Sequence, residues 1–151
     1  MHPLENHSRM IIAKIIDDEM WDRNKPKEST DMKLQKHKII YVDVDGTICD
    51  NPELPNFDDQ PMDYTKATPK HDRIRHINEL YDEGHHIVYW TARGCRSGLD
   101  HMELTKNQLL EWGAKYHSVE VGNKPHFDMY ICDKSFNSES WFHARERGLP
   151  T

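Results

Sequence analysis

Apolar positions along the chain form two kinds of pattern. Two short segments, 39–42 and 86–91, are runs of mostly β-branched or aromatic residues, which is typical of strands buried in a parallel sheet, and the largely apolar segment 128–132 is predicted to be another strand. A fourth segment, 116–121, alternates between polar and apolar positions and is also predicted to be a strand.

Helical spacing of apolar residues appears between and after these strands. The apolar positions of 74–81 predict a helix with Thr68 as its N-cap, Pro69 at its first position and Gly84 beyond its end. Two further helices are predicted in the same way, over about 100–112 and about 138–147.

The order strand, helix, strand, helix, strand, strand, helix predicts an α/β fold with a mostly parallel sheet. Right-handed crossovers would place helices on both faces of that sheet, in a three-layer α/β/α arrangement. Ligands of such sheets bind beyond the carboxyl ends of the strands.

The N-terminal part of the chain does not share this pattern. Residues 22–38 are almost wholly polar and lead into the first strong strand. We therefore expect a domain over 32–151, with 1–31 as a polar extension that is partly ordered or takes part in self-association. Residues 50–66 are rich in proline and acids and predict a long loop of functional importance.

Composition narrows the class of protein. The 151 residues suffice for one domain, and 20 Lys and Arg against 26 Asp and Glu leave a net charge of -6. An acidic chain is poorly suited to coat nucleic acid, because phosphate contacts need a basic face. No run of about 18 apolar residues and no apolar N-terminal leader is present, so we expect a cytoplasmic protein without a membrane span.

Three cysteines, Cys49, Cys95 and Cys132, are far apart and form no Cys-x-x-Cys pair. This pattern indicates neither a disulfide framework nor a structural zinc site, and it fits a reducing compartment. Each cysteine is close in sequence to a polar strand end, which leaves open a sensitivity to oxidation or to soft metals.

Polar residues follow the predicted strands at the points where they end. Because the carboxyl ends of parallel strands share one edge of a sheet, we expect these side chains to converge there. They are Asp43, Asp45, Thr91, Arg93, Lys124 and Asp133.

Residues 43–47, Asp-Val-Asp-Gly-Thr after an apolar strand, resemble the first signature of the haloacid dehalogenase superfamily of phosphatases. Thr91, Lys124 and Asp133 match the other three motifs in the same order, so the resemblance covers about 39–142. Trp90 to Gly94 and Lys124 to Lys134 also resemble a small capless subgroup linked to surface-polysaccharide sugar metabolism.

The resemblance implies a role for each motif residue. Asp43 would attack phosphorus and form an aspartyl-phosphate, while Asp45 would protonate the leaving oxygen and later activate water. Thr91 would donate to a phosphoryl oxygen, and Lys124 would neutralise charge on Asp43 and on the transferred group. Mg²⁺ would be held by Asp43, the carbonyl of Asp45 and Asp133.

Four further residues are candidates for contacts with the substrate. Gly46 permits a tight turn, so that amides up to Thr47 can approach a phosphate. Arg93 would contact the phosphate or sugar, or else form a structural ion pair. His126 follows Lys124 and is a candidate substrate contact, with a surface role as its alternative.

The fourth motif departs from the family pattern. Cys132 stands where the first of two adjacent acids is often found, so Asp133 would carry the metal alone. A supporting role for Asp128 or Ser135 stays open. Asp128 begins the predicted strand and would lie toward the opposite end of the sheet, which disfavours a direct role.

Neither 50–69 nor 91–124 is long enough to form a full cap domain. The site should therefore be accessible to solvent, unless a neighbouring subunit or residues 1–31 cover it. Formation of a homo-oligomer stays a possibility.

We expect a Mg²⁺-dependent phosphomonoesterase acting on a sugar phosphate or related small metabolite. The alternatives are a polynucleotide 3′-phosphatase, which the acidic balance disfavours, and a catalytically weak binding or regulatory module, which the intact Asp43 and Asp45 disfavour.

Overall fold

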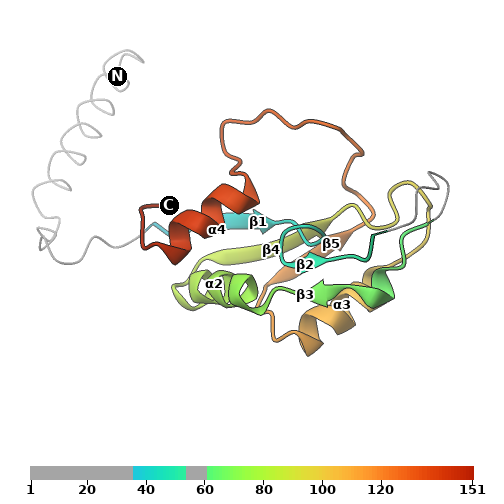
Figure 1. Ribbon diagram of the computed structural model, residues 1–151, viewed down its shortest axis with the longest axis horizontal. Helices are drawn as coiled ribbons and strands as arrows, with labels where there is room; N and C mark the ends of the chain where they lie inside the picture. Colours follow the sequence, from blue (N-terminus) through green and yellow to red (C-terminus); the bar gives the residue numbers. More distant parts are fainter. Residues whose placement is uncertain (1–35, 54–60) are drawn as a thin grey trace, which may run out of the picture. The chain divides into compact units, whose positions relative to one another are not determined.

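The computed structural model describes residues 36–53 and 61–151, which form an α/β fold with a three-stranded parallel sheet and three helices (Figure 1). The sheet order is β1-β4-β5, with β1 at Ile39–Val42, β4 at His86–Thr91 and β5 at Ser118–Val121. The helices are α2 (His71–Asp82), α3 (Met102–Glu111) and α4 (Ser138–Glu146). These positions confirm three of the four predicted strands and, within a few residues, all three predicted helices.

The described chain forms one compact unit from His37 to Thr151. The predicted extension over 1–31 lies outside the described residues. No helix in the described part of the chain has the length and apolar content needed to cross a bilayer.

The register of the sheet brings two strand ends together. Val42 of β1 is paired with Tyr89 of β4, and Thr91 of β4 is paired with Val121 of β5. Because the strands are parallel, the residues that follow β1 and those that end β4 lie at the same edge of the sheet.

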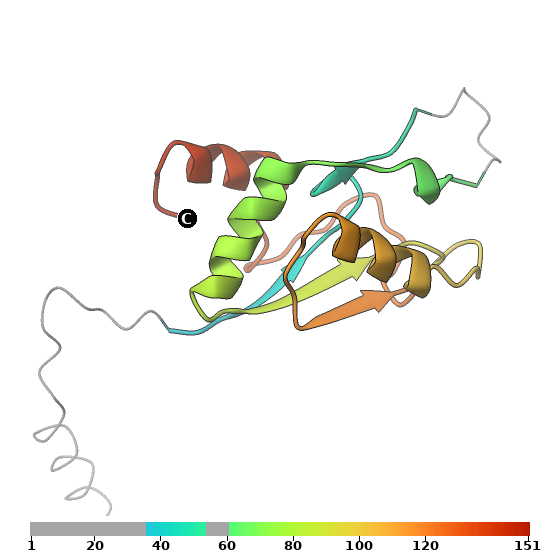
Figure 2. The same ribbon diagram turned by 90° about the horizontal axis from the view of Figure 1, so that it is seen from below.

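A single hydrophobic cluster joins the sheet to the helices. Helices α2 and α3 lie on one side of the sheet (Figure 1 and Figure 2) and bury their apolar faces against β4 and its neighbours. Among the members of the cluster with almost no exposure are Ile74, Ile77, Ile87, Tyr89, Leu109 and Phe142. Helix α4 packs against α2, where the Arg73 guanidinium stacks 4.8 Å from the Phe142 ring and pairs with Glu139 at 2.8 Å.

The start of α2 differs from the prediction. Thr68 and Pro69 form the short strand β3 (Thr68–Pro69), which pairs antiparallel with β2 (Cys49–Asp50), and the helix begins at His71 after Lys70. The backbone angle that proline imposes suits extended chain as well as a first helical turn, and here the partner strand decides between them. The β2–β3 pair thus ties together the two ends of the loop over 51–67, which also holds the short helix η1 (Tyr64–Lys66).

The predicted strand over 128–132 is absent from the structure, and this prediction was wrong. The segment joins β5 to α4 as irregular chain that arches over the side of the sheet opposite to α2 and α3 (Figure 1). Its apolar side chains are exposed, as are Ile39 and Tyr41 of β1. A strand needs a neighbour to supply its hydrogen bonds, and the apolar run alone does not provide one.

The described helices α2 and α3 cover one side of the sheet. The three-layer α/β/α arrangement expected from the sequence, with helices on both faces, therefore goes beyond what the described residues show.

Candidate active site

The turn after β1 is held by a buried residue between two aspartates. Val44 and Ile48 have no exposed surface, which turns Asp43 and Asp45 away from the core. The Gly46 amide donates to the Cys49 carbonyl at 2.9 Å, and Gly46 has a φ of +77°, a left-handed conformation that glycine adopts without strain. The two carboxylates are therefore presented by a well-anchored turn.

Asp43 is paired with a lysine that lies 81 residues away in sequence. Lys124 Nζ donates to Asp43 Oδ1 at 2.9 Å, and Thr47 Oγ1 donates to Asp43 Oδ2 at 3.1 Å. The lysine also lies 5.2 Å above the Trp90 ring. The Asp43 side chain keeps 40% exposure, so its carboxylate is oriented by two neighbours and still open to a solute.

The Asp45 side chain is less exposed than that of Asp43 and forms an ion pair with an arginine. Arg93 Nε donates to Asp45 Oδ2 at 2.9 Å and Arg93 Nη2 donates to Asp45 Oδ1 at 2.8 Å, a bidentate pair. Asn51 Nδ2 donates to Oδ1 at 2.8 Å, and Thr91 Oγ1 donates to Oδ2 at 3.3 Å. Burial by itself would raise the pKa of Asp45, but the hydrogen bonds and charge of Arg93 outweigh it and hold the pKa below its ordinary value.

Arg93 is itself buried, with 1% of its surface exposed. Its Nη1 donates to Gln108 Oε1 and to Thr105 Oγ1, both on α3. The Tyr64 ring covers the guanidinium at 4.7 Å. The structure thus places Arg93 as an internal ion-pair partner that positions Asp45, which is the second of the two roles expected for it.

Four partners of this network are not among the site residues that the sequence predicts. Asn51 and Tyr64 come from the loop over 51–67, while Thr105 and Gln108 lie on the buried face of α3. The helical spacing of α3 could have indicated that Thr105 and Gln108 face the core. Nothing in the spacing indicated that their polar groups would meet Arg93.

Asp133 and His126 lie on the exposed segment between β5 and α4. The structure brings together Asp43, Asp45, Thr91 and Lys124, and among the described residues no hydrogen bond or ion pair joins Asp133 to any of them. In 36–53 and 61–151, no three side chains of His, Cys, Asp or Glu are arranged so that they could hold a metal ion. The ion pair with Arg93 occupies the Asp45 carboxylate, whereas the expected ligand at this position is the Asp45 backbone carbonyl.

The cysteines differ in their surroundings. Cys49 is buried with its Sγ 3.6 Å from Asp45 Oδ1, and burial raises the pKa of this thiol to about 12. Cys132 is partly exposed, and the backbone N–H of Lys134 lowers the pKa of its thiol. Cys49 contacts the Asp45 carboxylate, and its raised pKa keeps the thiol protonated.

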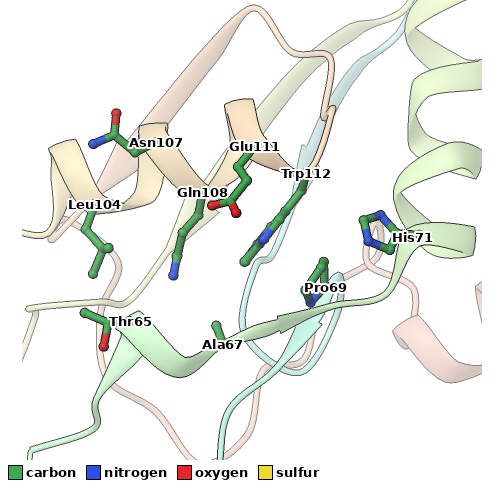
Figure 3. Close-up of a pocket in the computed structure, with 9 residues that line it drawn as sticks. All are labelled: Thr65, Ala67, Pro69, His71, Leu104, Asn107, Gln108, Glu111 and Trp112. Carbon is green, nitrogen blue, oxygen red and sulfur yellow. The ribbon is translucent and has the colours of Figure 1, made fainter.

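A pocket of about 410 Å³ lies between α3 and the segment over 65–71 (Figure 3). None of the strand-end residues lines it. It borders their network through Gln108, whose Nε2 donates to the Tyr64 carbonyl and whose Oε1 accepts from Arg93.

No protein-family model and no curated protein matches this chain. A crystal structure of a structural-genomics target from Vibrio cholerae is similar, with a TM-score of 0.54 and 24% sequence identity over 70% of this chain and 86% of that chain. At that identity the likeness shows the α/β fold alone, and the description of the Vibrio protein names no activity.

Proposed function

We propose that the protein is a phosphomonoesterase of the haloacid dehalogenase type, with Asp43 as nucleophile and a sugar phosphate or related small metabolite as substrate. The pairing of Asp43 with Lys124 and Thr47 carries this proposal. A half-exposed carboxylate beside a lysine can approach an anionic phosphate, because the ammonium group offsets part of the charge repulsion.

In the first step, a carboxylate oxygen of Asp43 bonds to phosphorus as the bond to the leaving alcohol oxygen breaks. The Lys124 ammonium stabilises the charge on the transferred group, and Thr91 supplies a hydroxyl near Asp45. In the second step, water attacks the aspartyl-phosphate and releases inorganic phosphate.

Asp45 is held as a carboxylate by Arg93, so it is present in the form that accepts a proton from the attacking water, and the same ion pair lowers its basicity. Protonation of the leaving oxygen needs the acid form of the same group, which the ion pair opposes. We therefore expect aryl phosphates, whose leaving groups need no proton, to react readily.

The lack of a full cap domain is also part of this proposal. The β2–β3 pair closes the loop over 51–67, and only α3 and β5 lie between Thr91 and Lys124. An uncapped site would admit substrates of several sizes, or would be covered by residues 1–31 or by a second copy in a homo-oligomer.

A requirement for Mg²⁺ belongs to the proposal through the family resemblance alone. The described residues hold no group of three His, Cys, Asp or Glu side chains suited to a metal ion, and the expected set would rely on two carboxylates and the Asp45 carbonyl. We therefore derive no step through the metal. Chelation with EDTA, followed by addition of Mg²⁺, tests the requirement directly: activity that survives EDTA would remove Mg²⁺ from the proposal.

The test of the proposed function is hydrolysis of p-nitrophenyl phosphate by the wild type and by Asp43→Asn, with Mg²⁺ present. Loss of the nucleophile should lower turnover by at least about 10³-fold. Asp82→Asn is the matched control, because Asp82 is an exposed partner of Lys115 far from Asp43 in sequence. Equal turnover in wild type and Asp43→Asn would exclude the assignment.

A panel of phosphate esters then separates the substrate classes. Release of phosphate from hexose phosphates but not from 3′-phosphorylated oligonucleotides is the expected result. The reverse preference would favour the polynucleotide 3′-phosphatase. An absence of turnover on every ester would leave the binding or regulatory module.

A further inference from the structure

The pocket between α3 and the segment over 65–71 is lined by two kinds of groups (Figure 3). Leu104 on α3 and Ala67 and Pro69 on the facing segment make apolar walls. The Glu111 carboxylate and the indole nitrogen of Trp112 extend into the space between them, as Figure 3 shows. Its volume, about 410 Å³, is within the range of small-molecule sites.

The charges of the lining disfavour a phosphate ester as the occupant. Glu111 is the one carboxylate of the lining, His71 is its one imidazole, and no lysine or arginine is among the lining residues. A phosphate group would meet a like charge at Glu111 without a permanent cation to offset it. The pocket therefore differs in its chemistry from the Asp43–Lys124 site.

The polar groups match a ligand that both donates and accepts hydrogen bonds. Glu111 can only accept when ionised, and the indole N–H of Trp112 can only donate. Gln108 Nε2 uses one hydrogen on the Tyr64 carbonyl and has a second. A ring with several hydroxyl groups satisfies both kinds of partner, and its C–H surfaces can contact Leu104 and Pro69.

We propose that this pocket binds an unphosphorylated sugar ring. The hydroxyl groups of the sugar would donate to Glu111 and accept from Trp112 and Gln108. Because a phosphatase acting on sugar phosphates releases such a sugar, the pocket is suited to its product; this link to the product, unlike the binding itself, rests on the proposed function.

The pocket is connected to Asp45 by side chains in direct contact. Gln108 lines the pocket and accepts from Arg93 Nη1, and Arg93 holds both oxygens of Asp45. A ligand that moves the Gln108 amide would change the position of the guanidinium. Ligand binding in the pocket should therefore change the NMR signal of the Arg93 guanidinium, even when no substrate is turned over.

The experiment is a ¹H–¹⁵N NMR titration of the full chain with methyl glucoside, methyl mannoside and methyl galactoside. We expect at least one of them to shift the Trp112 indole N–H and the Gln108 side-chain amide with one saturating curve, and to shift the Arg93 Nε–H along with them. Glu111→Gln should weaken that binding by about tenfold, since it removes a charged acceptor. Glu103→Gln, an exposed acid on α3 outside the pocket, should leave it unchanged.

Three results would overturn the assignment. The first two are no shift at Trp112 with any glycoside and an equal affinity of Glu111→Gln and wild type for the glycoside. The third is a saturable shift at Trp112 with ethanolamine, which would indicate a cation site instead. Glucose 6-phosphate is the charged control. Its affinity, read from the Trp112 indole shift, should be at least about tenfold lower than that of glucose. Since none of these readings needs catalysis, failure of the phosphatase assay and failure of sugar binding are distinguished.

Discussion

At the scale of single residues, Asp43 and Asp45 stand two positions apart and have different surroundings. Asp43 keeps 40% of its side chain exposed beside Lys124, whereas Asp45 keeps 24% and is bound by Arg93 through both oxygens. One strand end therefore presents an accessible carboxylate and a fixed one. Two carboxyl groups in unlike environments can take two roles in one reaction.

Replacement of Arg93 by methionine should destabilise the fold. The change Arg93→Met leaves Asp45 in a half-enclosed position without its charged partner, and removing one member of such a pair costs about 3 kcal/mol. Urea unfolding measures the loss in free energy. Arg96→Met removes an exposed arginine from the same loop and should change stability little; equal effects of the two changes would contradict the positioning role of Arg93.

The stability conferred by Asp45 should depend on pH in a defined direction. Its pKa in the folded protein lies below the ordinary value of 3.8, despite burial, because Arg93 favours the ionised form. A lowered pKa means that the contribution is complete above about pH 5 and is lost as the pH falls through the folded-state pKa.

The free energy of unfolding of wild type and Asp45→Asn, measured in urea from about pH 7 to pH 3, checks this direction. The difference between them should shrink as the pH falls below about 4. A difference that stays constant, or that grows toward acid, would show that Asp45 is not held ionised.

At the scale of elements, the loop after β4 holds Arg93 in place. Gly94 has a φ of +80°, and a Cβ added there would lie 2.1 Å from the Leu99 carbonyl oxygen. Gly98 in the same loop has a φ of +73°, but a Cβ there would meet nothing within 4 Å. The two glycines share a left-handed backbone and differ in the space around it.

Alanine at Gly98 should cost about 1–2 kcal/mol from the backbone conformation alone. Alanine at Gly94 should cost about 1–3 kcal/mol more, because the added methyl group overlaps the Leu99 backbone. Urea unfolding of both variants checks the order. A Gly94→Ala variant as stable as Gly98→Ala would mean that the 92–98 loop repacks freely.

The segment between β5 and α4 begins and ends near the site. Lys124 at its start contacts Asp43, and Glu139 just beyond its end contacts Arg73, which donates to the Thr47 carbonyl. Between these anchors, Met129, Tyr130 and Ile131 are exposed, and so are Ile39 and Tyr41 of the edge strand β1. Burying such surface is favourable, so contact between the two surfaces would be stabilising.

We therefore expect ions that bind Asp43 and Asp133 together to draw this segment onto β1. Hydrogen exchange with and without Mg²⁺ checks this expectation, with slower exchange at Met129 to Ile131 as the predicted result. Asp133→Asn is the control variant and should lose that protection. Equal exchange rates in the two conditions would mean that the segment stays as this structure has it.

At the scale of the whole molecule, residues 37–151 form a compact unit by themselves. A chain that starts at Met32 should therefore unfold with a free energy within about 0.5 kcal/mol of the full chain. Sedimentation of both chains tests at the same time whether residues 1–31 mediate self-association. A large loss of stability in the shorter chain would show that the domain includes part of 1–31.

Periodicity predicted the three helices and the strand near 116–121, because a repeat of two or 3.6 residues follows from the local backbone. Short runs of β-branched and aromatic residues predicted the strands at 39–42 and 86–91. The sequence pattern also indicated which side chains would meet, since Asp43, Asp45, Thr91 and Lys124 all lie near strand ends that parallel pairing brings to one edge. The orientation of Arg93 was beyond such reasoning, because it depends on Gln108 and Thr105 of a distant helix.

The sequence by itself determined where the regular segments lie and which polar groups stand at their ends, because both depend on neighbours within a few residues. The tertiary structure alone decided that Thr68 and Pro69 pair with β2, that Arg93 turns inward to Asp45, and that 128–132 form no strand. In each of these cases a residue or segment had two suitable conformations. The choice was made by whichever hydrogen-bond partner the folded chain brought within reach.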